Sequence, residues 1–233
     1  MAKKQSKAIV QQKAALAAFG VLVAAIAAYL LWLTVADVPQ GEFVEGEHYQ
    51  IVDNPRRIRS DKIEVMEFFS YACIHCYNFD PDLTDWVEAQ GERVNFVRMP
   101  AVANEYWRLL GRHYFTLEAL NEVESQHMNF FREIHDGRKT FPTPDALAAS
   151  YASGEPARAA YLQAFNSTEV TSNLTRADQM ARRLKIASVP TVVIQGKYIV
   201  RTTREIGPKR MLDVMDFLVE KERQALETAP TPG

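Results

Sequence analysis

Blocks of apolar residues with two different periods divide the chain into expected strands and helices. Apolar residues on both faces predict a buried strand over residues 62–69, and a second strand is expected over 94–99. A helix is expected between them, starting at or near residue 73 and ending before Gly91. Its apolar positions are Tyr77, Phe79, Leu83 and Trp86. With a short edge strand over 49–52, these elements predict a strand–strand–helix–strand unit.

The middle and the end of the chain carry a different pattern. Apolar residues recur at helical spacing from residue 104 to 164, and one long amphipathic helix is expected over 169–184. Two short apolar runs follow at 189–194 and 198–200, and the Gln-Gly-Lys sequence between them is a strong β-hairpin signal. A last helix is expected over 208–226.

The expected order is therefore β, β, α, β, a helical block, α, β, β, α. A strand–helix–strand unit followed by a hairpin and a helix is the plan of the thioredoxin fold, so we expect an α/β protein of that fold with an inserted helical domain. The expected domains are a basic tip and membrane anchor over 1–36, a tether over 37–48, a thioredoxin-like domain over 49–103 and 170–226, the insertion over 104–169, and a flexible tail over 227–233.

The N-terminal segment has the pattern of a membrane anchor. Four lysines, the last of them Lys13, precede an uncharged and mostly apolar run over 14–35, and about 20 helical residues span the hydrocarbon core of a bilayer. Tyr29 and Trp32 lie near its far end, where aromatic rings favour the membrane interface. We therefore expect one N-terminal transmembrane helix, with the lysines in the cytoplasm and everything after Asp37 on the other side.

A cleaved signal peptide is the alternative for this segment. Thr34-Val35-Ala36 is a passable cleavage site, but it follows an apolar run that is already long enough to span a bilayer, so we favour the uncleaved anchor. In a bacterium the far side is the periplasm, an oxidising compartment in which disulfides form. The expected location is the inner membrane with the folded domain in the periplasm, or the periplasm alone if the segment is cleaved.

The remaining composition is that of an ordinary globular protein. Hydrophobic residues make up 47% of the 233 residues, charged residues make up 24%, and the formal net charge is -2. This near-neutral balance gives no electrostatic footprint for nucleic acid. No nucleic-acid partner is therefore expected.

The two cysteines of the chain, Cys73 and Cys76, lie three positions apart where the first buried strand gives way to a helix. A Cys-x-x-Cys pair in that setting is typical of a redox centre. A structural zinc site would need four ligands, and the histidines show no paired ligand spacing. Haem attachment would need a histidine directly after the second cysteine, where Tyr77 stands. A structural staple over so short a loop would add only about 2 kcal/mol. We therefore favour redox chemistry at Cys73, without a metal or a cofactor.

The two cysteines differ in their expected roles. Cys73, at the helix N-terminus, faces unpaired backbone N–H groups and the positive end of the helix dipole, which favour its thiolate. His75 can add a hydrogen bond or, when protonated, a charge. Cys76, one turn further into the helix, is expected to be the buried resolving thiol.

Glu67 interrupts an otherwise apolar strand, and burial of an unpaired carboxylate is costly. One interpretation is an acid of raised pKa near Cys76 that relays a proton during exchange. The other is an ion pair with Lys62 or Arg98.

Three motifs together resemble the thiol:disulfide interchange proteins of the DsbA type. They are the run Glu67–Tyr77 with its Cys-x-His-Cys sequence, Val189-Pro190, and Gln195–Tyr198. The resemblance covers about residues 43–226, and it is specific because the histidine within the pair and the distant Val-Pro occur together. Ile74 departs from the family, which usually has proline there, and the expected anchor departs from its best-known members, which are soluble.

The thioredoxin plan and this resemblance imply a substrate-binding edge beside the thiols. Val189-Pro190 would lie opposite the cysteine pair with Pro190 in cis, and a free backbone edge there could accept an extended substrate. An ordinary proline at the start of a strand is the alternative. Val189 and Ile74 are the expected substrate-binding residues, and Pro190 is grouped with the catalytic set.

The expected function is a periplasmic disulfide oxidase that donates its Cys73–Cys76 disulfide to exported proteins with free thiols. The resemblance implies re-oxidation by a membrane partner of the DsbB type. A disulfide reductase or isomerase is one alternative, and the reduction potential separates it from an oxidase. A membrane-tethered holdase chaperone is another, and it would survive a Cys73→Ser substitution.

Overall fold

The computed structural model describes residues 20–26, 43–58, 60–203 and 206–228. Residues 20–26 are helical. The rest of the predicted membrane-spanning segment lies outside the described residues, as do residues 37–42 of the predicted tether and 229–233 of the predicted tail. Among the described residues, no helix is both long and apolar enough to cross a bilayer. The chain divides into two units, Met1–Glu42 and Phe43–Gly233, and the fold below is that of the second.

A five-stranded sheet forms the centre of this unit, with the strand order β1-β5-β4-β2-β3. Strands β2 and β3 are parallel and are joined through a helix, whereas β4 is antiparallel to both β2 and β5. The strands are β1 (Gln50–Ile51), β2 (Ile63–Phe69), β3 (Val94–Pro100), β4 (Thr191–Ile194) and β5 (Tyr198–Arg201). This arrangement confirms the predicted thioredoxin fold.

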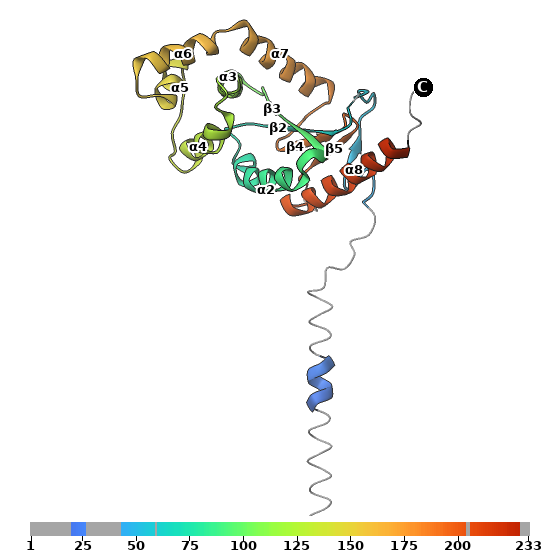
Figure 1. Ribbon diagram of the computed structural model, residues 1–233. Coiled ribbons are helices and arrows are strands. Elements are labelled where there is room, and N and C mark those ends of the chain that lie inside the picture. The colour runs from blue at the N-terminus through green and yellow to red at the C-terminus, as the bar shows by residue number, and fades with distance from the viewer. Residues whose placement is uncertain (1–19, 27–42, 59, 204–205, 229–233) are drawn as a thin grey trace, which may run out of the picture. The chain divides into compact units, whose positions relative to one another are not determined.

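Helices cover both faces of the sheet (Figure 1). Helices α2 (Ile74–Gln90) and α8 (Pro208–Thr228) pack on one face, and α7 (Thr168–Arg183) packs on the other and against β3. The inserted helices are α3 (Glu105–Ala119), α4 (Val123–His135), α5 (Pro144–Tyr151) and α6 (Glu155–Phe165). A single 3-10 turn, η1 (Gly91–Arg93), links α2 to β3. The helical insertion predicted between the two halves of the fold is therefore confirmed.

The alternation of side chains along β2 separates two cores. Ile63 and Val65 belong to the core beneath α2 and α8, whereas Met66 and Phe68 belong to the core beneath α7. Because successive residues of a strand face opposite sides, Glu67 shares the α2 side with Val65. The carboxyl of Glu67 is therefore directed toward α2.

Local chemistry sets the limits of α2 and of the hairpin. Cys73 is the N-cap of α2, with an extended backbone, and Gly91 ends the helix at a φ of 54°. In the β4–β5 hairpin Gln195 and Gly196 both have positive φ, and Lys197 N donates to the Ile194 carbonyl at 2.9 Å. Positive φ values at the two central residues of this β-turn match the twist of the strands, and glycine meets that demand readily.

Candidate active site

Cys73 lies between the start of α2 and the loop before β4. Its backbone N–H donates to the Ser70 carbonyl at 3.0 Å, which fixes the turn that ends β2. Its Sγ–H donates to the carbonyl oxygen of Val189 at 3.6 Å, although 116 positions separate the two residues. The Val189–Pro190 peptide bond is cis. The structure therefore brings Cys73, Val189 and Pro190 together, with the proline in the predicted isomer.

The surroundings of Cys73 favour its thiolate. A hydrogen bond from the Cys76 thiol lowers the pKa of the Cys73 thiol most, against the opposing effect of burial. The backbone N–H groups of Cys76 and His75 and the charge of His75 lower it further, and the resulting pKa is about 6 instead of 9.0. His75 and Ile74 are exposed beside it, with 45% of Ile74 accessible. Partial burial of Cys73 leaves its sulfur open to attack.

Cys76 has the opposite environment. It is fully buried one turn further along α2, among aromatic side chains that include Phe69 and Tyr71. Burial raises the pKa of its thiol far above the ordinary range, and the neighbouring Cys73 and the Glu67 carboxylate raise it further. Both cysteines are free thiols in this structure. The pair combines a stabilised, accessible thiolate with a buried, protonated thiol.

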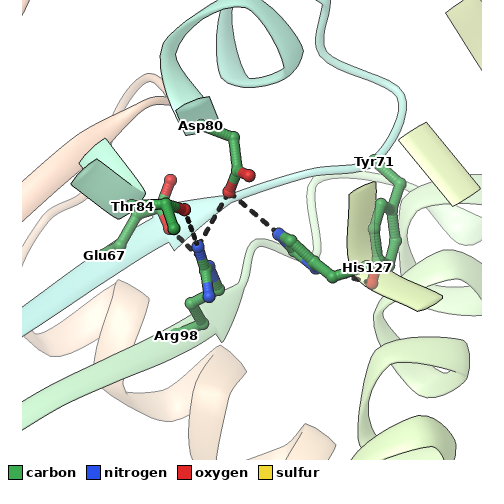
Figure 2. Close-up of polar contacts among 6 residues, drawn as sticks. All are labelled: Glu67, Tyr71, Asp80, Thr84, Arg98 and His127. Atoms are coloured by element: carbon green, nitrogen blue, oxygen red, sulfur yellow. Dashed lines mark hydrogen bonds and ion pairs between the residues drawn. The ribbon is translucent and has the colours of Figure 1, made fainter. Parts of the chain in front are cut away.

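Glu67 is buried beneath the catalytic helix and pairs with Arg98. The two residues are directly opposite in the parallel β2–β3 register, so their side chains lie on the same face. Arg98 Nε donates to Glu67 Oε2 at 3.1 Å, and Arg98 Nη2 donates to Asp80 Oδ1 at 2.8 Å (Figure 2). Burial raises the pKa of Glu67 to about 7, although Arg98 acts to lower it. Glu67 thus has the raised pKa of one interpretation and the Arg98 ion pair of the other.

Two residues of this site, Asp80 and His127, were given no role by the sequence predictions. Asp80 follows Cys76 by four positions on the buried face of α2, and it accepts from both Arg98 and His127. Its pKa is lowered because His127 and Arg98 outweigh the effect of burial. The other ring nitrogen of His127 is 2.8 Å from the hydroxyl of Tyr71, which completes the chain of contacts drawn in Figure 2. A signal for His127 was present, because it precedes the buried Phe130 and Phe131 by three and four positions on one helical face.

The first turn of α2 also contacts the inserted helices. The ring of Tyr77 stacks on His135 with centroids 5.1 Å apart, and its hydroxyl donates to Asp136 at 2.7 Å. His135 Nε2 lies 2.9 Å from the carbonyl oxygen of Tyr71. Helix α4 therefore supports the catalytic turn from outside the thioredoxin half of the fold.

A groove of about 310 Å³ adjoins the loop before Pro190. Val189 lines it, so the groove is continuous with the carbonyl that faces Cys73. Its walls come from the segment after β3, the start of α3, the end of α7 and the loop before β4, and they include Ala101, Val102, Trp107, Ala181 and Ile186. Among the described residues, no group of three or more His, Cys, Asp or Glu side chains could hold a metal ion.

Comparison with known sequences agrees with this geometry. Residues 60–214 match the family described as Thioredoxin. The chain is 32% identical over 185 residues to the thiol:disulfide interchange protein DsbA of Pseudomonas aeruginosa, covering 79% of this chain and 88% of the relative. It is 35% identical over 194 residues to the DsbA of Azotobacter vinelandii, covering 83% of this chain and 88% of the relative.

Solved structures give the same result. The crystal structure of Pseudomonas aeruginosa DsbA superimposes with a TM-score of 0.75 at 32% identity, covering 80% of this chain and 97% of that one. The oxidoreductase DsbA from Xylella fastidiosa gives a TM-score of 0.72 at 30% identity, covering 78% and 98%. With a Cys-x-His-Cys pair at the start of α2 and a cis-proline facing it, this chain belongs to the DsbA-type thiol:disulfide oxidoreductases of the thioredoxin superfamily.

Proposed function

We propose that this protein is a periplasmic disulfide oxidase that transfers its Cys73–Cys76 disulfide to exported proteins with free thiols. The observation that carries the proposal is the contrast between the two sulfurs, since the Cys73 thiol has a pKa of about 6 while Cys76 is buried and protonated. A thiolate that is stable at neutral pH is a good leaving group, and it favours the reduced enzyme over the oxidised one.

The size of this effect follows from the ionised fractions. At pH 7 a thiol with a pKa of 9.0 is about 1% ionised, whereas one with a pKa of about 6 is about 90% ionised. The corresponding stabilisation of the reduced form is about 1.4 kcal/mol, which raises the reduction potential of a two-electron couple by about 30 mV. The thiolate environment thus supports an oxidant and argues against a reductase.

The reaction proceeds in two exchanges. A substrate thiolate attacks Cys73 Sγ, a mixed disulfide forms, and the bond to Cys76 breaks, leaving a thiolate on Cys76 that takes up a proton. Glu67, which has a pKa of about 7, is the nearby group suited to give that proton. A second substrate thiolate then attacks the substrate sulfur of the mixed disulfide and releases Cys73 as a thiolate. The substrate loses two electrons and the enzyme gains them.

The substrate segment is proposed to lie along the loop before Pro190. Val189 presents its carbonyl there, Ile74 is exposed directly after Cys73 in the chain, and the adjoining groove can receive apolar side chains. The re-oxidising partner is proposed to be a membrane protein of the DsbB type, since the chain belongs to the family that such proteins serve.

The test is a measurement of the Cys73–Cys76 reduction potential in glutathione buffers, together with the oxidation of a reduced, unfolded substrate. An oxidase has a potential near or above the poise of the compartment, and Cys73→Ser abolishes substrate oxidation. A potential far below that poise would indicate a reductase or isomerase. If Cys73→Ser still prevents the aggregation of unfolded chains as well as the wild type does, while the wild type does not oxidise them, the protein is a holdase.

We also propose that residues 14–35 anchor the protein in the inner membrane, with the catalytic domain in the periplasm. The support is the length of the uncharged run and the lysines before it. The full-length protein should remain in the membrane fraction after carbonate extraction and be cleaved by protease from the periplasmic side alone. Recovery of a soluble product that starts near Asp37 would show instead that the segment is a cleaved signal.

A further inference from the structure

The buried contacts beneath α2 form one directed chain of hydrogen bonds (Figure 2). At one end Arg98 donates to Glu67 at 3.1 Å and to Asp80 at 2.8 Å. At the other end His127 Nε2 lies 3.0 Å from the same oxygen of Asp80, and His127 Nδ1 lies 2.8 Å from the Tyr71 hydroxyl. All except Arg98 are at most 4% exposed, so water does not compete for these groups.

The charges in this chain do not balance if both carboxyls are ionised. One guanidinium faces two carboxyls in a buried site, and burial of an uncompensated anion is costly. One carboxyl is therefore expected to hold a proton. Asp80 accepts two donors on one oxygen at 3.0 Å or less, whereas Glu67 accepts only Arg98 at 3.1 Å among the described residues. Because hydrogen bonds to the charged form favour it, the negative charge belongs on Asp80.

The tautomer of His127 follows from its two partners. An ionised Asp80 can only accept, so His127 Nε2 must carry the proton that faces it. Burial lowers the pKa of His127, so the ring is neutral and its Nδ1 accepts from the Tyr71 hydroxyl. Asp80, His127 and Tyr71 are thus satisfied together in one protonation pattern. That pattern leaves the exchangeable proton on Glu67.

We infer that His127, a residue of the inserted domain, is a positioning residue for the exchange reaction: its Nε2–H holds the negative charge on Asp80 and so keeps the proton on Glu67, beside Cys76. This inference rests on the proposed function of Glu67 as the proton donor to Cys76. It gives α4 a chemical role in the reaction, since His127 lies 47 positions beyond Asp80 in the chain and contacts neither cysteine in the described hydrogen bonds.

The titratable and charged groups that act on the chain come from every surrounding element. Those that influence Glu67 are Arg98 on β3, Asp80 and Cys76 on α2, and Tyr114 on α3. Those that influence His127 are Asp80, Arg98, Tyr71 and His113. Among the residues of the inserted domain named here, His127 is the one that contacts the carboxyl of Glu67 or Asp80 directly.

The experiment follows the side-chain carboxyl carbons of Glu67 and Asp80 by NMR during a pH titration of the reduced protein. His127→Phe keeps the aromatic packing but removes the donor, and His127→Gln restores an N–H donor. We expect the Glu67 midpoint, about 7 in the wild type, to fall by about one to two pH units in His127→Phe, to stay near the wild-type value in His127→Gln, and the Asp80 midpoint to rise in His127→Phe. His127→Leu replaces His127→Phe if the latter does not fold.

Two outcomes would overturn the inference. One is an unchanged Glu67 midpoint in the variants that lack the donor, and the other is an equal shift in His127→Gln, which would assign the effect to packing. The titration does not depend on turnover. If the midpoints move as expected but Glu67→Gln exchanges disulfides at the wild-type rate, the charge assignment stands and the proton-donor role proposed for Glu67 fails.

Discussion

The contribution of Cys76 to the reactivity of Cys73 can be measured by removing one hydrogen-bond donor, the Cys76 thiol. The Cys76 thiol is the largest single influence that lowers the pKa of Cys73, ahead of the backbone N–H groups and the charge of His75. Cys76→Ala removes that donor, whereas Cys76→Ser keeps a hydroxyl donor of similar size in the same place. His75→Ala removes the charge but leaves the backbone N–H.

The expected change follows from the strength of a hydrogen bond to a charged acceptor. Such a bond contributes about 1.5–3 kcal/mol, which corresponds to roughly 1 to 2 pKa units. The pKa of Cys73 should therefore rise from about 6 to about 7–8 in Cys76→Ala. At pH 6 the thiolate fraction would fall from about half to between about 1% and 10%, so alkylation would slow by about 5-fold to 50-fold.

The assay is the rate of iodoacetamide alkylation as a function of pH, with the ultraviolet absorbance of the thiolate as an independent measure. Cys76→Ser should stay within about half a unit of the wild type, and His75→Ala should give a smaller rise than Cys76→Ala. A Cys76→Ala protein that titrates like the wild type would contradict this role of Cys76, and so would a larger rise in the Cys73 pKa in His75→Ala than in Cys76→Ala.

Two further substitutions test the buried acid Glu67 and Ile74, the first of the two residues between the cysteines. Burial raises the pKa of Glu67 from 4.5 to about 7, so unfolding releases a proton at pH values between the two. The wild type should therefore lose about 3 kcal/mol of stability relative to Glu67→Gln as the pH rises through that range. Urea unfolding of both reduced proteins at several pH values measures this, and parallel pH profiles would contradict it. Ile74→Pro should leave the Cys73 pKa within about half a unit of the wild-type value and the stability within about 1 kcal/mol. Ile74 is the first residue of α2, where proline is tolerated, and the N–H groups that act on the sulfur belong to His75 and Cys76. The extended backbone of Cys73 already suits a following proline. Alkylation and urea unfolding check this, and a pKa shift of more than about one unit would show that Ile74 itself tunes the thiol.

The elements that could be predicted well from the sequence are those whose residue pattern lies within the element itself. The apolar run of β2, the Gln-Gly turn of the hairpin and the glycine after α2 each carry their own chemistry, and each element ends within a few residues of its expected limit. The position of Cys73 at the start of α2 is of the same kind. The pairing of Glu67 with Arg98 could be named only as one alternative, since it depends on the β2–β3 register.

The buried partners of the site were beyond reach for a different reason. Asp80 has the appearance of a solvent-facing acid among other polar residues of α2, and the helical spacing of His127 with Phe130 and Phe131 indicates burial of the ring but not its partner. Their contact arises because the insertion folds back so that α4 packs on α2. Which buried charge meets which donor is thus set by tertiary packing rather than by periodicity.

The far end of the catalytic helix is held by one carboxylate on α8. Asp216 accepts from the indole of Trp86 at 2.9 Å and from the side-chain amide of Gln90 at 2.7 Å. Pro81, in the middle of α2, has no N–H to give to the turn before it, so the backbone ladder is interrupted between the cysteines and this fixed end. We therefore expect any change in the first turn that accompanies making or breaking the sulfur–sulfur bond to end at Pro81. Amide hydrogen exchange over residues 82–90 should be the same in both redox states, which lets the enzyme cycle without loosening its core.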